Sequence, residues 1–337
     1  MPAARLLLTI ILAKVFLLWR AYEKLMSWSW LELFWTVGIC GITFSGGLVT
    51  FFNWPDILSD LVKYGKAGEA KRRKRSVLLE MIEVPKRWFI HFYILAVCSM
   101  TACVVMVGQL YWSGGWTAVD SDLFLLLRSA IHHLCHPLAR TKVTELDIVV
   151  VVGLLWLHVV RRLSESIFLS VYSATRMNVL HYVAGLAHYS LLPITVLAAA
   201  PGFAHANYDA EWRWTSLSST QVVGIVLFMW CSVQQHRCLA VLASMRRNFK
   251  GDITNYAHGI PMGSWFQLVS CPHFLFEIGI YFSLHLASNF RHVYWTYALL
   301  FVLTNQLIAA RITHQWYQKK YSRMYPKTRT AIIPYVM

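Results

Sequence analysis

The run Trp88 to Trp112, WFIHFYILAVCSMTACVVMVGQLYW, contains no Asp, Glu, Lys or Arg and decides the class of fold. An apolar helix of about 20 residues is long enough to cross the hydrocarbon core of a bilayer, which is roughly 30 Å thick. Inside that core every backbone polar group needs an internal partner, and an α-helix provides one. The run therefore predicts a transmembrane helix.

Six further apolar runs lead to the same interpretation. The seven runs are Leu33 to Phe52, Trp88 to Trp112, Ile148 to Val160 with a continuation to Tyr172, Val179 to Ala200, Val222 to Ala243, Leu268 to Ala287 and Val293 to Ala310. Of the 337 residues, 57% are hydrophobic and only 14% are charged, a composition unusual for a water-soluble domain. We expect an all-α polytopic membrane protein with about seven transmembrane helices in one bundle.

The N-terminal part stands apart from these runs. Arg5 to Arg20 is a shorter apolar run interrupted by Lys14, so an extra span, an interfacial helix and a signal anchor all stay open. The seven cysteines lie mostly within apolar runs and imply no disulfide framework. The expected organisation is an N-terminal apolar extension over residues 1–30 and one transmembrane domain over residues 31–337.

The net charge of +15 is concentrated on one side of the expected bundle. The loops and tail on that side hold 18 Lys and Arg, including the stretch Lys71 to Arg75, whereas the loops on the other side hold 5. Because cytoplasmic loops carry the excess of Lys and Arg, this bias predicts a cytosolic C-terminus. The basic stretch is most simply a topology signal, with lipid or nucleic-acid binding as the alternatives.

Ionisable side chains inside a membrane are costly, about 2.5 to 3.5 kcal/mol each at a helix centre, and are expected to face a protein interior or a watery cavity. In the third run, His158, Arg162 and Glu165 are spaced at i, i+4 and i+7, which places them on one helical face. A structural ion pair and a functional site are both consistent with this pattern.

Three later runs also carry polar residues. The fifth turns polar at Gln234 to Arg237, and the sixth places His273 and Glu277 at i and i+4, where a bonded packing pair is the alternative to a site. The polar residues of the seventh are Asn305, Gln306, Arg311, His314 and Tyr317. All four clusters fall in the cytosolic halves of different spans, as a shared cavity open to the cytosol requires.

The surplus of Arg, Lys and His in these clusters suits a polyanion such as a nucleotide cofactor, since guanidinium groups pair with phosphates. No G-x-G-x-x-G follows a strand and no G-x-x-x-x-G-K-[ST] occurs, so neither a Rossmann domain nor a P-loop is expected. The stretch His132 to His136 holds metal-ligand types, but on the other side of the membrane and without further histidine boxes. We expect no metal site.

Several motifs occur in an order that points to a known family. They are Tyr64-Gly65-Lys66, Glu83-Val84-Pro85-Lys86-Arg87-Trp88-Phe89-Ile90-His91-Phe92-Tyr93, Leu157 to Glu165, Gly259 to Phe266 with Val269 to Glu277, and the tail motifs His314 to Tyr317, Tyr325 to Arg329 and Ile333-Pro334. Over roughly residues 55 to 337 the chain resembles the polyprenol reductases of the steroid 5-alpha-reductase family.

This resemblance implies a seven-helix enzyme of the endoplasmic reticulum membrane that binds NADPH within the bundle and reduces a carbon–carbon double bond. The polyprenol branch reduces the alpha-isoprene unit of polyprenol or its aldehyde, on the route to dolichol for protein N-glycosylation. Glu83 matches the acid near the substrate, and His158, from the third-span motif, is the second candidate catalytic residue. The expected cofactor-lining residues are Lys66, Arg162, Glu165, Gln235, Arg246, His258, His273, Glu277, His314 and Tyr317.

The chain also departs from the family pattern. Val159 stands where the steroid-reducing branch has a Tyr, which disfavours a steroid substrate, and His273 stands where Asn is common but can still donate a hydrogen bond. The expected partner is thus a polyisoprenoid lipid within the membrane, with no nucleic acid. The alternatives are an enoyl-thioester reductase of the same superfamily, a non-catalytic lipid-binding protein and a transporter.

Overall fold

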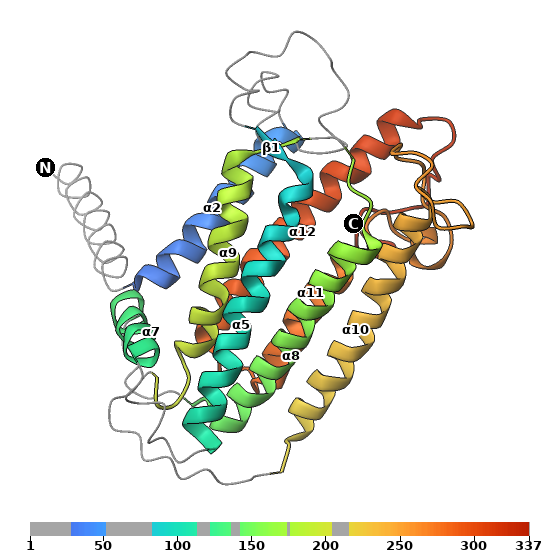
Figure 1. The fold of residues 1–337 in the computed structure, drawn as a ribbon. Coiled ribbons are helices and arrows are strands. Elements are labelled where there is room, and N and C mark those ends of the chain that lie inside the picture. Colours follow the sequence, from blue (N-terminus) through green and yellow to red (C-terminus); the bar gives the residue numbers. More distant parts are fainter. Residues whose placement is uncertain are drawn as a thin grey trace, which may run out of the picture.

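The computed structural model describes residues 28–51, 83–112, 122–135, 142–173, 176–203 and 216–336. Within these ranges, seven helices of 16 residues or more run alternately up and down in one bundle (Figure 1). They are α2 (Trp30–Phe51), α5 (Phe89–Trp112), α8 (Glu145–Ser164), α9 (Val179–Leu197), α10 (Ser219–Ser244), α11 (Pro272–Ala287) and α12 (Val293–Lys320). Each corresponds to one of the apolar runs, so the predicted fold class is confirmed.

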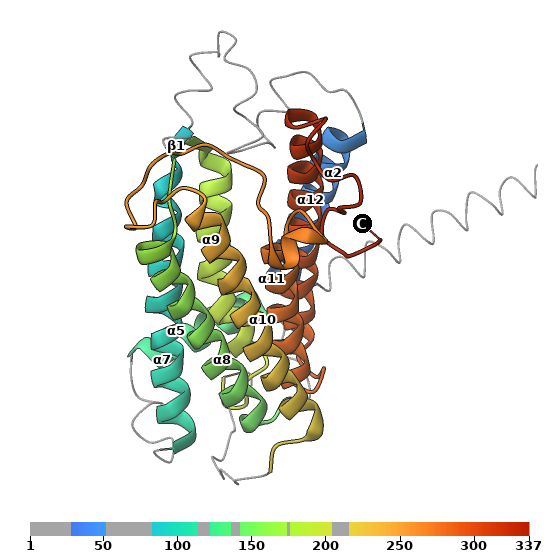
Figure 2. The ribbon, with the colours of Figure 1, turned by 90° about the vertical axis from the view of Figure 1, so that its right-hand side faces the viewer.

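The helices are arranged with α5 and α9 on one side, α2 and α12 on the other, and α8, α10 and α11 between them (Figure 2). Small residues allow the closest approaches. A Cβ on Gly224 of α10 would lie 2.7 Å from the backbone nitrogen of Ala287 in α11, too close for any side chain. Close backbone contact at small residues is typical of helices that associate within membranes.

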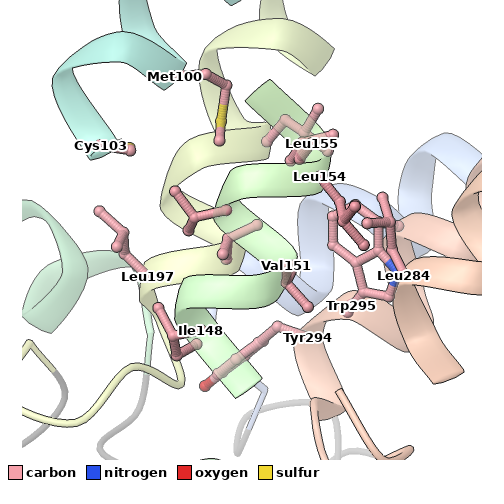
Figure 3. Packing of buried hydrophobic residues seen from close by; sticks show 14 of the residues in the cluster. Met100, Cys103, Ile148, Val151, Leu154, Leu155, Leu197, Leu284, Tyr294 and Trp295 are labelled. Carbon is pink, nitrogen blue, oxygen red and sulfur yellow. The ribbon is translucent and has the colours of Figure 1, made fainter. Parts of the chain in front are cut away.

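The hydrophobic core lies where α5, α8, α9, α11 and α12 meet (Figure 3). Met100, Val151, Leu155, Leu284 and Trp295 are all at most 1% exposed there. Many residues that face outward are large and apolar, among them Val105, Leu180 and Val226. Apolar residues therefore fill the interior and also cover the surface, as expected for a bundle solvated by lipid.

Side-chain caps fix the beginnings of several helices. Thr144 accepts a hydrogen bond from the Asp147 backbone at the start of α8 while the Asp147 carboxylate accepts one from the Thr144 backbone, and Ser218 and Gln221 repeat this arrangement on α10. Such capping boxes satisfy N–H groups that lack a partner in the helix. Pro272 begins α11, where its missing N–H costs nothing.

The structure also contains short elements that the apolar runs did not predict. Helix α7 (Asp122–Leu134) lies in a segment expected to be a loop, because a 13-residue amphipathic helix is too short to appear as a membrane span. Strands β1 (Glu83–Pro85) and β2 (Arg176–Asn178) pair antiparallel beside the first turns of α5 and α9. A 3₁₀ turn, η2 (Lys86–Trp88), leads into α5, a π-helical turn, η3 (Glu165–Leu169), extends α8, and a second 3₁₀ turn, η4 (Ser264–Gln267), precedes α11.

Five segments of the described chain are long and apolar enough to cross a membrane, in α2, η2 with α5, α9, α10 and α12. Helix α8 misses this criterion because it carries two acidic and two basic residues, and α11 because it has only 16 residues. Each of these two helices holds one of the four polar clusters noted in the sequence. The expected N-terminal extension up to residue 27 and the stretch Lys71 to Arg75 lie outside the described residues.

All seven cysteines lie among the described residues and are free thiols there. Within the described ranges, no three His, Cys, Asp or Glu side chains are grouped so that they would hold a metal ion. His132 and His133 lie on α7, while His136 is outside these ranges.

Candidate functional site

A pocket of about 300 Å³ lies at the end of the bundle where α10 and α12 finish and α11 begins, which we call the pocket end. Its polar and aromatic lining residues are Lys86, Ser170, Tyr172, Arg246, His258, His273, Phe274, Thr313, Trp316 and Tyr317. Four predicted cofactor-lining residues, Arg246, His258, His273 and Tyr317, are thus brought together from positions up to 71 residues apart.

Arg246 and His258 form the polar edge of this pocket. The Arg246 guanidinium donates to the backbone carbonyl of Val171 and also contacts the His258 ring. The hydroxyl of Tyr321, just past α12, donates to the His258 carbonyl and fixes the loop that carries this residue. The Arg246 cation is therefore held at the pocket by contacts with two other parts of the chain, one of which Tyr321 fixes.

Deeper in the bundle, the buried carboxylate of Glu165 pairs with the cationic side chains at the end of α8. Glu165 Oε1 accepts from Arg161 Nη1 at 2.7 Å, and Glu165 Oε2 accepts from Arg162 Nη1 at 2.5 Å. His236 Nδ1 on α10 lies 2.9 Å from Glu165 Oε1. The π-helical turn that begins at Glu165 is a feature often found at functional sites.

A second carboxylate, Glu277 on α11, joins this group through α8 and α10. Glu277 Oε1 lies 3.4 Å from His158 Nε2, and Glu277 Oε2 accepts from the Gln235 side-chain amide. The same amide donates to the His273 carbonyl at 3.2 Å. His158 and Gln235 are linked in turn, because Arg161 Nη2 lies 3.2 Å from His158 Nδ1 and 2.6 Å from Gln235 Oε1.

These contacts assign the tautomer of neutral His158. A guanidinium group only donates hydrogen bonds, so His158 Nδ1 accepts from Arg161. The hydrogen of the neutral ring is then on Nε2, facing Glu277. The arrangement orients a histidine and a carboxylate toward each other in the interior of the bundle.

The network has a closed side and an open side. The side chains of His158 and Glu165 are only 1% and 3% exposed, whereas those of Glu277, Arg162 and Arg161 keep 13%, 17% and 22%. Buried charges are expected to be paired, and these are. We call the part of the network formed by these three partly exposed side chains its open side.

Arg161 and Lys86 are functional candidates that sequence reasoning did not select. Arg161 contacts three members of the network, and its spacing of i+3 from His158 and i−4 from Glu165 was the signal available in the sequence. Lys86 follows Pro85 at the start of η2 and lines the pocket. Only the fold shows that the neighbouring Arg87 does not line the pocket.

Two predicted residues, Glu83 and His314, lie apart from this network. Glu83 is on β1, where its carboxylate is 3.8 Å from Arg176 Nε on β2, at the surface of the pocket end. His314 Nδ1 is 2.6 Å from the Ser270 hydroxyl, in a separate cluster with Tyr325. Lys66 lies outside the described residues.

Tyr172 connects the pocket with the network. It lines the pocket, and its hydroxyl lies 2.6 Å from that of Ser166 in the π-helical turn. Burial raises the pKa of the Tyr172 phenol above its ordinary value, and the nearby Tyr93 adds to that shift. The hydroxyl therefore stays protonated at neutral pH and available as a donor.

Comparisons with known proteins agree with this architecture. Residues 176–337 match the family model described as 3-oxo-5-alpha-steroid 4-dehydrogenase. The chain is 40% identical to a polyprenal reductase of Caenorhabditis elegans over 83% of its own length and 88% of the relative. Polyprenal reductases of Danio rerio and Homo sapiens are 33% and 32% identical over 83% of this chain and 88% and 86% of their lengths.

The chain belongs to the polyprenal reductases of the steroid 5-alpha-reductase family. Its membership confirms the resemblance drawn from the motifs. The family match from residue 176 covers β2 and α9 to α12, which include Gln235, Glu277 and the pocket residues from Leu239 onward. The α8 part of the network, with His158 and Glu165, lies within the span shared with the Caenorhabditis elegans relative, because that match covers 83% of a 337-residue chain.

Proposed function

We propose that this protein is an NADPH-dependent reductase of the alpha-isoprene double bond of polyprenal or polyprenol, on the route to dolichol for protein N-glycosylation. The observation that carries the proposal is the cation–carboxylate network, open on one side and adjacent to a cation-lined pocket, in a chain of the polyprenal reductase family. Ionisable groups within a membrane bundle are functional candidates by default.

The donor set of the pocket fits a dinucleotide phosphate. Arg246, Lys86 and His258 supply positive charge or N–H groups for phosphates, and Trp316 and Tyr317 supply aromatic faces for a planar ring. When bound, NADPH supplies the hydride. Lys66 and Arg246 are the candidates for the 2'-phosphate, and His273, Gln235 and Glu277 for the nicotinamide end.

The chemistry favours the aldehyde as the substrate. Hydride addition to the β-carbon of an enal sends charge to the carbonyl oxygen, where a positioned acid stabilises it, whereas an allylic alcohol has no such oxygen. Glu83 is the proposed acid at the mouth of the bundle, and His158 is the proposed second catalytic residue. Arg162 and Glu165 form an ion pair on the same helical segment as His158.

The proposed location is the endoplasmic reticulum membrane, with the pocket end and the C-terminus in the cytosol, where NADPH is available. The bias of 18 against 5 basic residues supports this orientation. A glycosylation acceptor sequence added at Met337 should stay unmodified. Its glycosylation would place the C-terminus in the lumen and contradict the proposed orientation.

The deciding experiment incubates purified protein in detergent with NADPH and, separately, polyprenal, polyprenol, an enoyl thioester and a 3-oxo-4-ene steroid. We expect reduction of polyprenal and a clear preference for NADPH over NADH. Turnover of the thioester alone would make the protein an acyl reductase. NADPH binding without turnover of any of the four would make it a lipid-binding protein, and flux of lipid across vesicles would make it a transporter.

A further inference from the structure

The Tyr93 hydroxyl on α5 is held by Arg162 of the network. Arg162 Nη2 donates to the Tyr93 oxygen at 2.8 Å, and the Arg162 guanidinium carbon lies 5.1 Å from the centre of the Tyr93 ring. Arg162 is itself fixed by Glu165 at 2.5 Å. The Tyr189 ring packs edge-on against the Tyr93 ring, with the centroids 5.7 Å apart. The phenol thus has a defined position.

The direction of this hydrogen bond leaves a proton to donate. A guanidinium group has no acceptor, so the Tyr93 oxygen is the acceptor of the Arg162 bond. The hydroxyl hydrogen of Tyr93 then points to another acceptor. A hydroxyl whose oxygen already accepts from a cation is also polarised toward donation.

Tyr93 lies near the start of α5, seven residues after Lys86, which lines the pocket. Its partner Arg162 belongs to the open side of the network. Tyr93 is itself only partly buried. A substrate that enters the open side from the membrane can therefore bring a polar head within reach of the Tyr93 hydroxyl.

We infer that Tyr93 is a catalytic residue that donates a hydrogen bond to the carbonyl oxygen of the enal, with Arg162 as the residue that positions it. This inference rests on the proposed function. As hydride adds to the β-carbon, the electrons of the double bond move toward the carbonyl and negative charge develops on the oxygen. Tyr93 stabilises that charge and keeps its own proton, in addition to the donor proposed at Glu83. A proton from solvent then adds to the α-carbon and the carbonyl re-forms.

The test compares Tyr93→Phe with Tyr111→Phe, a matched control on the same helix. Tyr111 donates to the Pro201 carbonyl at the opposite end of α5, so the control also loses one buried phenol hydrogen bond. With saturating polyprenal, kcat of Tyr93→Phe should fall about 100-fold, the loss typical of removing one oxyanion donor. Tyr111→Phe should stay within about 2-fold of wild type, since it removes no donor from the reacting oxygen.

Two further measurements separate a catalytic from a structural role. Affinity for NADPH, followed by fluorescence titration, should be unchanged in Tyr93→Phe. The kinetic isotope effect with NADPH deuterated at the transferred position should rise, because loss of the donor slows hydride addition more than product release.

The outcomes are distinct. Near-normal kcat in a well-folded Tyr93→Phe, or an isotope effect equal to that of wild type, overturns this inference and leaves the proposed function standing. Equal loss of NADPH affinity and kcat would make Tyr93 a structural residue and also overturn it. If wild-type protein does not reduce polyprenal, the proposed function fails and this inference fails with it.

Discussion

Buried carboxylates are found at both ends of the bundle, with different partners. Asp147, at the end opposite the pocket, is completely buried and accepts from the Thr144 backbone at 2.9 Å, the Gln221 amide at 2.9 Å and the Asn289 amide at 2.7 Å. Glu277, near the pocket, faces His158 and Gln235 and keeps 13% of its side chain exposed.

The difference shows how one chemical group serves two purposes. Asp147 joins α8, α10 and the turn before α12, where three neutral donors bond to it and the Arg291 guanidinium lies 3.7 Å from its Oδ2. Glu277 belongs to a network with several cationic groups and an open side. A closed set of partners holds helices together, whereas a partly open one is suited to binding and chemistry. The following changes test that contrast.

The largest expected effect concerns Glu83, a third carboxyl group, which lies at the pocket end but outside the network. If it donates to the oxygen that gains charge, Glu83→Gln should lower kcat about 100-fold, with little change in NADPH affinity. Arg176→Gln is the control, because it removes the surface partner of Glu83, and exposed pairs contribute only about 0 to 1 kcal/mol. Normal turnover in a folded Glu83→Gln protein would mean that Glu83 only pairs with Arg176 and takes no part in catalysis.

Glu277→Gln keeps the shape of the side chain and removes its charge. We expect the Kd for NADPH, measured by fluorescence titration, to rise about 30-fold, which corresponds to roughly 2 kcal/mol and to a hydrogen bond that involves a charged group. The unfolding temperature should change little, because the open side admits water to the altered site. An unchanged Kd together with a large loss of stability would give Glu277 the structural role that we assign to Asp147.

Asp147→Asn makes the corresponding change at the closed end. The new amide group would face donors from Thr144, Gln221 and Asn289, so at least one of them loses its acceptor. The free energy of unfolding should fall by about 1.5 kcal/mol. Thermal unfolding in detergent measures this loss, and kcat at low temperature should match wild type. A variant with normal stability and reduced turnover would contradict the contrast between the two ends.

The smallest effect is expected for Lys86→Ala, which removes one cation from the lining of the pocket. The KM for NADPH should rise about 5-fold, roughly 1 kcal/mol, and less at high salt, as for a partly solvated contact with phosphate. Arg87→Ala changes the neighbouring exposed residue and should leave this KM unchanged. Equal effects of the two substitutions would indicate that Lys86 acts on NADPH through the general surface potential and not through a direct contact with a phosphate.

Much of the fold was predictable because the signal is local. The run Trp88 to Trp112 differs from α5 by one residue at its start, and Val179 to Ala200 contains all of α9. Helix α12 continues ten residues beyond the predicted Ala310, because a helix does not end where the hydrocarbon does. Helix α7 was missed, since its signal is amphipathic and short.

The candidate site was predictable only in part. The sequence pointed to the correct helices, because ionisable residues within apolar runs are conspicuous. It paired Glu277 with His273, its neighbour at i−4 on one face, whereas the nearest partners of Glu277 in the fold are His158 of α8 and Gln235 of α10. Tyr93 appeared in the sequence only as part of a motif, and its contact with Arg162 crosses 69 residues.

By itself, the sequence determined that this chain is a helical membrane bundle of the polyprenal reductase type with its polar residues toward one end. Hydropathy and charge bias act on each segment separately, so they can be read without knowing which helices are neighbours. The tertiary structure alone decided that Glu277 faces His158 and that Arg162 holds Tyr93. Those contacts depend on the rotation and depth of each helix, which are fixed by packing against all the others.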